Sequence, residues 1–155
     1  IKHNLNKAYA EMNIKPQRHF ATPTPLNNWL WYAIAEVDSG YYTSYHSVFD
    51  GWPDTTFTFF HRNEFLLKSI TDQEELRLLL RFSKDYYTIE QWGDTLVFND
   101  LRFGQMAGWA DPKARFAFHY YLQHTAENKF VVQRGRFKNW NAKTTQSFIK
   151  RIKGN

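Results

Sequence analysis

The stretch "WLWYAIAEVDSGYYTSYHSVF", residues 29–49, decides the fold class. It contains two runs rich in aromatic and β-branched residues, 29–37 and 41–49, on either side of Asp38-Ser39-Gly40. Such runs favour pleated strands. A glycine in the turn is expected where the backbone needs a positive φ. The pattern therefore predicts an antiparallel hairpin with a three-residue turn.

The flanking sequence extends this hairpin into a sheet with helices. A Gly93-Asp94 turn predicts a second hairpin. Strands are expected at 55–61, 86–92, 95–103, 115–123 and 129–137, and helical periodicity occurs near the N-terminus, at 71–84 and at 141–154. Strands joined by short turns are antiparallel. We therefore expect an α+β fold with a single antiparallel, largely meandering β-sheet of about six to seven strands and two or three flanking helices.

Local signals place the helices and the domain. Leu5, Ala8, Tyr9 and Met12 share one face of the N-terminal helix. Thr71 with Glu74 forms a capping-box pattern at the start of the second helix. Asn141 is the expected N-cap of the last helix, and Gly154 its stop. We expect one domain over 1–155, with a β-rich body at 17–138 and a basic C-terminal helix at 141–154.

Composition limits the classes of function. There is no cysteine, so disulfides and cysteine-based metal or nucleophile sites are excluded. The net charge is +5, and basic residues gather near the C-terminus. Lys143, Lys150, Arg151 and Lys153 could meet an anionic membrane surface, although a solvated helix face is the simpler interpretation. Nucleic acid is not favoured, because the aromatic run 29–37 contains no Lys or Arg.

Motifs for metal or nucleotide chemistry are missing from the sequence. The six histidines show no metal-ligand spacing, and no nucleophile elbow or phosphate-binding loop is present. We predict no metal site and no cofactor in this chain.

His46 and Asp50 form the first candidate for chemistry. Both fall on one face of the predicted strand 41–49, so the carboxylate could orient the imidazole. In that case the pKa of His46 should lie well above 6.5. The alternative is that Asp50 caps the turn at 50–53 while His46 is half-exposed, and this alternative is preferred.

The second candidate is "NDLRFGQMAGW", residues 99–109. Asp100 and Arg102 share a strand face, but two residues of one strand do not meet ideally, so we expect each to pair elsewhere. The functional alternative is an anion-binding or docking site. The residues assigned to it are Arg102, Gly104, Gln105, Gly108 and Trp109.

Two long segments carry a family resemblance. "TPTPLNNWLWYAIAEVDSGYYTSYHSVFD" and "LLLRFSKDYYTIEQWGDTLVFNDLRFGQMAGW", with the closing "RIKGN", resemble the C-terminal part of the membrane-bound metal-dependent hydrolase family. This family is also described as LexA-binding, inner-membrane-associated hydrolases. The likeness covers roughly residues 10–120 and is most specific in P-T-P-x-N-N-x-x-W and D-L-R-F-G.

The resemblance implies a soluble domain that follows membrane helices of a bacterial inner-membrane protein. Residues 1–15 would continue the last of those helices, and Ile1 would mark the edge of a fragment. The metal-binding His/Asp motif of the family lies in the helices that precede such a domain, so no catalytic or metal residue carries over to this chain. A divalent metal is expected only in that preceding membrane region.

Three functional hypotheses follow. The first is an accessory, regulatory or substrate-covering domain that docks on its own N-terminal membrane domain and is inactive alone. The second is a self-contained hydrolytic domain that uses His46, Asp50, Asp100 and Arg102, which would then converge in one pocket. The third is a structural or protein-interaction module.

Overall fold

A computed structural model of the chain describes residues 2–51, 55–122 and 140–154. The described part is α+β with antiparallel sheets, as predicted. It divides into two compact units. Unit 1 comprises described residues within 1–60, 107–114 and 140–155, and unit 2 those within 61–106 and 115–139.

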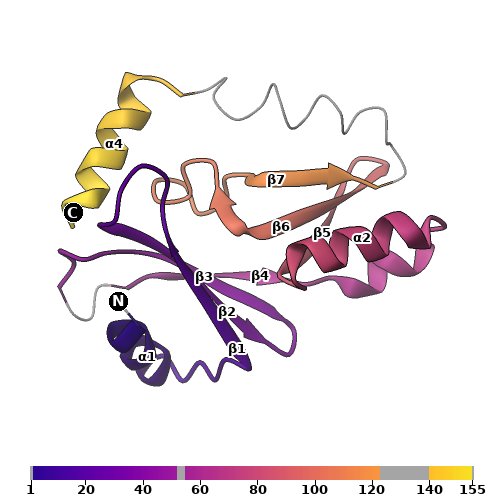
Figure 1. Cartoon of the computed structure of the whole chain (residues 1–155), viewed down its shortest axis with the longest axis horizontal. Coiled ribbons are helices and arrows are strands. Elements are labelled where there is room, and N and C mark those ends of the chain that lie inside the picture. Colours follow the sequence, from indigo (N-terminus) through magenta and orange to yellow (C-terminus); the bar gives the residue numbers. More distant parts are fainter. Residues whose placement is uncertain (1, 52–54, 123–139, 155) are drawn as a thin grey trace. The chain divides into compact units, whose positions relative to one another are not determined.

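Unit 1 contains a four-stranded sheet in the order β1-β2-β3-β4 (Figure 1). The strands are β1 (Arg18–Pro23), β2 (Leu30–Val37), β3 (Gly40–Ser47) and β4 (Phe57–His61). Strand β1 was not predicted from the sequence; it pairs antiparallel with β2 from Arg18↔Glu36 to Pro23↔Trp31. A proline is tolerated at the end of this strand because β1 lies at the sheet edge.

The predicted hairpin exists, but glycine has a different role in it. Val37 pairs with Gly40, so the turn contains two residues, Asp38 and Ser39, instead of three. Gly40 already belongs to β3. A Cβ atom on it would lie 2.1 Å from the carbonyl oxygen of Phe60. Glycine is therefore needed for the close approach of another strand's backbone and not for the turn geometry.

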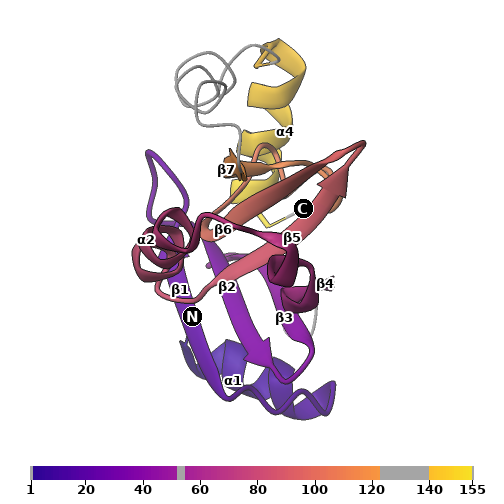
Figure 2. The ribbon, with the colours of Figure 1, turned by 90° about the vertical axis from the view of Figure 1, so that its right-hand side faces the viewer.

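Helix α1 (Lys2–Glu11) covers one face of this sheet (Figures 1 and 2). Leu5 and Tyr9 form a core cluster with the small residues Ala33 and Ala35 of β2. The small side chains permit the helix to approach the strand closely. Met12, predicted on the same face, lies beyond the end of the helix and is 53% exposed.

Unit 2 contains a three-stranded sheet in the order β5-β6-β7. Its strands are β5 (Tyr87–Trp92), β6 (Thr95–Gln105) and β7 (Phe116–Tyr121). Trp92 pairs with Thr95 across the predicted Gly93-Asp94 turn, and Gly93 has φ 63°. This second hairpin is confirmed.

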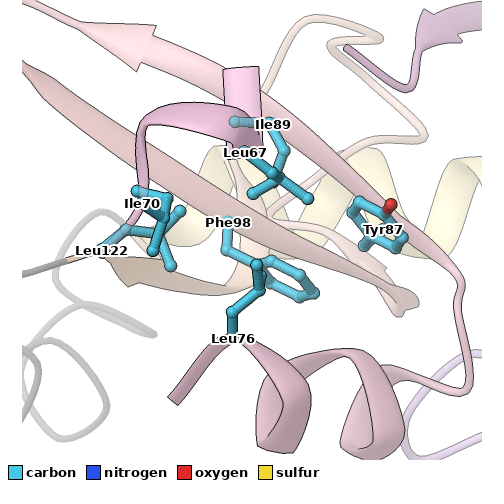
Figure 3. Close-up of a cluster of buried hydrophobic side chains, with 7 residues drawn as sticks. All are labelled: Leu67, Ile70, Leu76, Tyr87, Ile89, Phe98 and Leu122. Atoms are coloured by element: carbon cyan, nitrogen blue, oxygen red, sulfur yellow. The ribbon is translucent and has the colours of Figure 1, made fainter. Parts of the chain in front are cut away.

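Two helices cover one face of the β5-β6-β7 sheet. They are the 3₁₀ helix η1 (Glu64–Ser69) and α2 (Gln73–Ser83). Their side chains meet those of the sheet in a core, drawn in Figure 3, that is made of Leu67, Ile70, Leu76, Tyr87, Ile89, Phe98 and Leu122. The N-cap of α2 is Asp72, whose side chain accepts from the Glu75 amide, so the predicted Thr71 cap is wrong by one residue.

The predicted single sheet of six to seven strands is wrong. The described strands form two separate sheets of four and three strands. Hairpin signals identify neighbours joined by short turns, but β4 and β5 are separated by η1 and α2. The sequence pattern therefore could not tell whether these two strands pair. The predicted strand at 129–137 lies outside the described residues.

Helix α4 (Ala142–Ile152) lies where the sequence predicted the last helix. The Asn141 side chain accepts from the Thr144 amide, and Gly154 has φ 85°. These observations confirm the predicted cap and stop.

Candidate functional site

The first candidate pair lies at the end of β3 in unit 1. His46 is the penultimate residue of the strand and pairs with Trp31 of β2. Asp50 lies just beyond the strand, where the chain turns, and its backbone amide donates to the Ser47 carbonyl at 3.1 Å. The Asp50 Oδ2 atom lies 3.5 Å from His46 Nδ1. The sequence therefore identified two residues that do lie side by side.

The Asp50 carboxylate is fully occupied by structural partners. Its Oδ2 atom accepts from the Ser47 amide at 2.7 Å. Both terminal nitrogens of Arg151 donate to it, each at 2.7 Å, in a two-pronged ion pair. Asp50 thus caps the turn 47–50. The predicted turn at 50–53 includes residues that lie outside the described part of the chain.

His46 is buried, whereas the preferred interpretation made it half-exposed. It is only 2% exposed, and the side chains of Asp50 and Thr55 lie against its ring. Its Nδ1 atom lies 3.1 Å from the Thr55 hydroxyl, and its Nε2 atom has no hydrogen-bond partner among the described residues. The described contacts of His46 are therefore with buried groups of the fold.

The electrostatics of His46 also differ from the functional hypothesis. Burial lowers the pKa of His46, Asp50 opposes this shift, and Arg151 reinforces it. A functional pair was expected to raise that pKa above 6.5. The direction is the opposite because desolvation of the imidazolium outweighs the attraction of a carboxylate that is already paired.

Arg151 belongs to this site, although the sequence did not predict it there. It was placed among basic residues of a solvated helix face, with an anionic membrane surface as the alternative, yet its guanidinium binds Asp50 and also donates to the Tyr45 carbonyl at 2.5 Å. The Ser47 hydroxyl donates to the carbonyl of Ile152 next to it. Together these contacts fasten the end of α4 to the end of β3. No sequence signal links residues 101 positions apart.

The second candidate pair, Asp100 and Arg102, lies in β6 of unit 2. The expectation that they pair elsewhere is wrong. Asp100 Oδ1 accepts from both the backbone amide and Nε of Arg102 at 3.0 Å, and Oδ2 accepts from Nη2 at 2.6 Å. The carboxylate is 0% exposed and the guanidinium side chain 14%. Phe82 and Phe103 flank the guanidinium, 4.9 and 5.2 Å from its carbon.

An irregular strand explains why these two residues meet. Asp100 pairs with Phe118 and Gln105 with Phe116, so residues 101–104 of β6 lie opposite a single residue of β7. A bulge of this kind breaks the alternation of side chains on which the prediction rested. Gly104, with φ 69°, provides one left-handed residue within it. The Asp100 side chain then bonds the displaced Arg102 amide.

The other residues of the predicted ligand loop also make structural contacts. The Met106 amide donates to the Arg115 carbonyl at 2.9 Å and is not available to an anion. Gln105 is 5% exposed and pairs with Phe116. In unit 1, Gly108 is buried, and the Trp109 ring contacts those of Tyr45 and Phe148. Trp109 therefore packs in an aromatic cluster.

The two candidate pairs belong to different units. His46 meets Asp50 in unit 1, and Asp100 meets Arg102 in unit 2. The convergence of all four in one pocket stays a prediction.

Over residues 2–51, 55–122 and 140–154, no group of three or more His, Asp or Glu side chains is placed to hold a metal ion. In that same part of the chain, no helix is long and apolar enough to cross a bilayer. No protein-family model matches the chain, and no curated protein or solved structure is significantly similar to it.

Proposed function

We propose that this chain is an accessory domain, of the binding or regulatory class, in a membrane-anchored metal-dependent hydrolase. It would dock on the membrane domain of the same protein and cover or regulate a site formed there. The hydrolase part of the proposal rests on the family resemblance. The accessory part rests on the two carboxylates.

One observation carries the accessory role: each candidate catalytic carboxylate is already neutralised by an arginine. Arg151 holds Asp50 and Arg102 holds Asp100, both through two nitrogens. A general base must reach a substrate proton within hydrogen-bond distance. Releasing either carboxylate would leave a buried charge unpaired, which is costly. These groups are therefore better suited to holding the fold than to catalysis.

The residues that give the resemblance have local structural roles, which supports a shared domain. In the P-T-P-x-N-N segment, Asn27 Nδ2 donates to the Thr24 hydroxyl at 2.8 Å, and Asn27 Oδ1 accepts from the Leu30 amide at 2.7 Å. In the D-L-R-F-G segment, Asp100 and Arg102 form the bulge pair. Such residues specify turns and bulges, so a domain of the same shape would retain them.

The test is an activity comparison. The full-length protein in membranes and the purified 155-residue chain are assayed with p-nitrophenyl acetate and p-nitrophenyl phosphate, with Mg²⁺, Mn²⁺ or Zn²⁺ and with a chelator. We expect metal-dependent hydrolysis only from the full-length protein. The variant His46→Gln should keep that activity per folded molecule, because His46 is buried and packed against groups of the fold.

The opposite results would overturn the proposal. Removal of a general base typically costs about 100-fold to 10,000-fold in rate. A loss of that size in a folded His46→Gln protein would make His46 catalytic. Hydrolysis by the 155-residue chain alone, abolished by the same substitution, would establish the self-contained enzyme.

A further inference from the structure

Two loops of unit 1 expose large apolar side chains at the same end of its sheet. The loop between β1 and β2 carries Leu26, which is 103% exposed, and Trp29, which is 52% exposed. The loop after β3 carries Val48 and Phe49, exposed by 45% and 60%. The Val48 amide donates to the Trp29 carbonyl at 2.8 Å and joins the two loops. These four residues are called the tip patch below.

The exposure of the tip patch is built into the backbone. Leu26 has φ 66°, a left-handed conformation that an L-leucine adopts at a cost. The Asn27 side chain holds this turn, since its Oδ1 atom accepts from the amides of Trp29 at 3.0 Å and Leu30 at 2.7 Å. Thr24 closes the loop through its amide, which donates to the Leu30 carbonyl at 2.8 Å. A strained leucine held fully in solvent by a polar network indicates a use for that side chain.

The end of α4 brings positive charge next to the tip patch. A Cβ atom on Gly154 would lie 2.8 Å from the Phe49 carbonyl oxygen, so the chain after α4 runs against the second loop. Lys153, the residue before it, is exposed, as is Lys150 one turn earlier in α4. Asp50, the carboxylate beside Phe49, is neutralised by Arg151.

Acidic side chains lie at the other end of this sheet. Glu36 pairs with Arg18, and Asp38 accepts from Gln17, both near the β2–β3 turn. The sheet therefore has an end with apolar side chains and two exposed lysines, opposite an end that carries Asp38 and the Glu36–Arg18 ion pair. Tryptophan, aliphatic side chains and lysines together are the composition that suits a membrane interface with anionic lipid.

We infer that the tip patch, with Lys150 and Lys153, docks on an anionic lipid bilayer. The apolar side chains enter the headgroup region, and the lysines contact lipid phosphates. This deepens the proposed function, on which it rests for the presence of a membrane, but the contact uses only this chain. It also replaces the expectation that Arg151 takes part, because Arg151 is bound to Asp50.

The test is co-sedimentation of the 155-residue chain with vesicles. Vesicles of phosphatidylcholine with phosphatidylglycerol are compared with pure phosphatidylcholine. The double variant Leu26→Ser with Trp29→Ser removes two exposed side chains and keeps the backbone hydrogen bonds. The matched control is Phe65→Ser, since Phe65 of η1 is 66% exposed and belongs to unit 2. Lys150→Ala with Lys153→Ala tests the charge, with Lys68→Ala as its control.

We expect binding to the mixed vesicles that weakens with salt. The affinity for these vesicles should fall at least tenfold in the Leu26/Trp29 variant, because the burial of one large apolar side chain typically changes a binding constant by more than about tenfold. Each lysine should contribute about fivefold, and the Phe65 and Lys68 controls should bind as the parent chain does.

Three results would overturn the inference. The first is that the chain does not bind the mixed vesicles. The second is that the patch variants and the control variants lose vesicle binding equally. The third is that the chain does not bind vesicles but forms a dimer in sedimentation equilibrium, and that the Leu26/Trp29 variant abolishes this dimer. The last result would assign the patch to a second copy of the chain. None of these outcomes depends on hydrolysis, so the activity assay and the vesicle assay can fail independently.

Discussion

The two aspartate–arginine ion pairs have the same bonding pattern, but their residues are separated by very different distances along the chain. Asp100 and Arg102 are two residues apart in β6, whereas Asp50 and Arg151 are 101 residues apart. Each carboxylate is at most 5% exposed and is held by two nitrogens of the guanidinium. The short-range pair fixes a bulge in one strand. The long-range pair ties a helix to a sheet.

The difference teaches what each pair stabilises. The loop closed by Asp100 and Arg102 costs little chain entropy, so that pair shapes the backbone locally. The contact between Asp50 and Arg151 closes a long loop, whose entropic cost grows slowly with length. It therefore depends on neighbouring contacts, such as that of Ser47 with Ile152. We therefore expect that loss of the Asp100–Arg102 pair destabilises the core of unit 2. Loss of the Asp50–Arg151 pair should mainly weaken the attachment of α4 to β3.

The largest effect should come from Arg102→Met. This change leaves the fully buried Asp100 carboxylate without its partner, which typically costs about 3–5 kcal/mol in the free energy of unfolding. Urea denaturation followed by circular dichroism measures the loss.

The matched control is the double variant Asp100→Asn with Arg102→Met, which removes both charges. It should be more stable than Arg102→Met alone, since no buried charge is then left uncompensated. A single variant that loses less than about 1 kcal/mol, in the range of an exposed ion pair, would show that the pair is not structural.

The smallest effect on stability should come from the protonation of His46, which lies next to Asp50 of the long-range pair. Because burial lowers the pKa of His46, the unfolded chain binds a proton more readily than the folded one. The stability contributed by neutral His46 is present above about pH 6.5 and is lost as the pH falls through the lowered pKa. NMR titration of the imidazole should give a midpoint below about 6.5.

Two substitutions sharpen this titration. Asp50→Asn should lower the His46 midpoint further, because Asp50 is the group that raises that pKa. His46→Gln should reduce the loss of stability on acidification below about pH 6.5. A midpoint above that value in the parent chain would restore the functional pair proposed from the sequence.

The sequence predicted elements that depend on local patterns. The hairpins β2–β3 and β5–β6 and the helices α1, α2 and α4 follow from periodicity and turn residues. The division into two sheets could not be predicted, because it depends on which strands pair across η1 and α2. Strand β1 (Arg18–Pro23) was not predicted. It ends in Pro23, which is untypical of a strand but is tolerated at the edge of a sheet.

The candidate site was predicted only in part. The proximity of His46 and Asp50 was predicted from strand alternation, but it arises from a turn: β3 ends at Ser47, and the chain then turns and brings Asp50 back beside His46. The pairing of Asp100 with Arg102 was not predicted, because the bulge at 101–104 breaks that alternation. The role of Arg151 arises from tertiary packing alone. In the sequence it is one of several basic residues in a predicted helix, and nothing there distinguishes it from the others.

The claim that these carboxylates hold the fold together is tested most directly by a double-mutant cycle on Asp50 and Arg151. Native-state hydrogen exchange of the α4 amides is measured for Asp50→Asn, Arg151→Met and the double variant, with the β5 and β6 amides as the internal reference. We expect a coupling free energy of about 1–3 kcal/mol in α4 and unchanged protection in β5 and β6. Effects that add to within about 0.3 kcal/mol would contradict the claim and leave Asp50 available for chemistry.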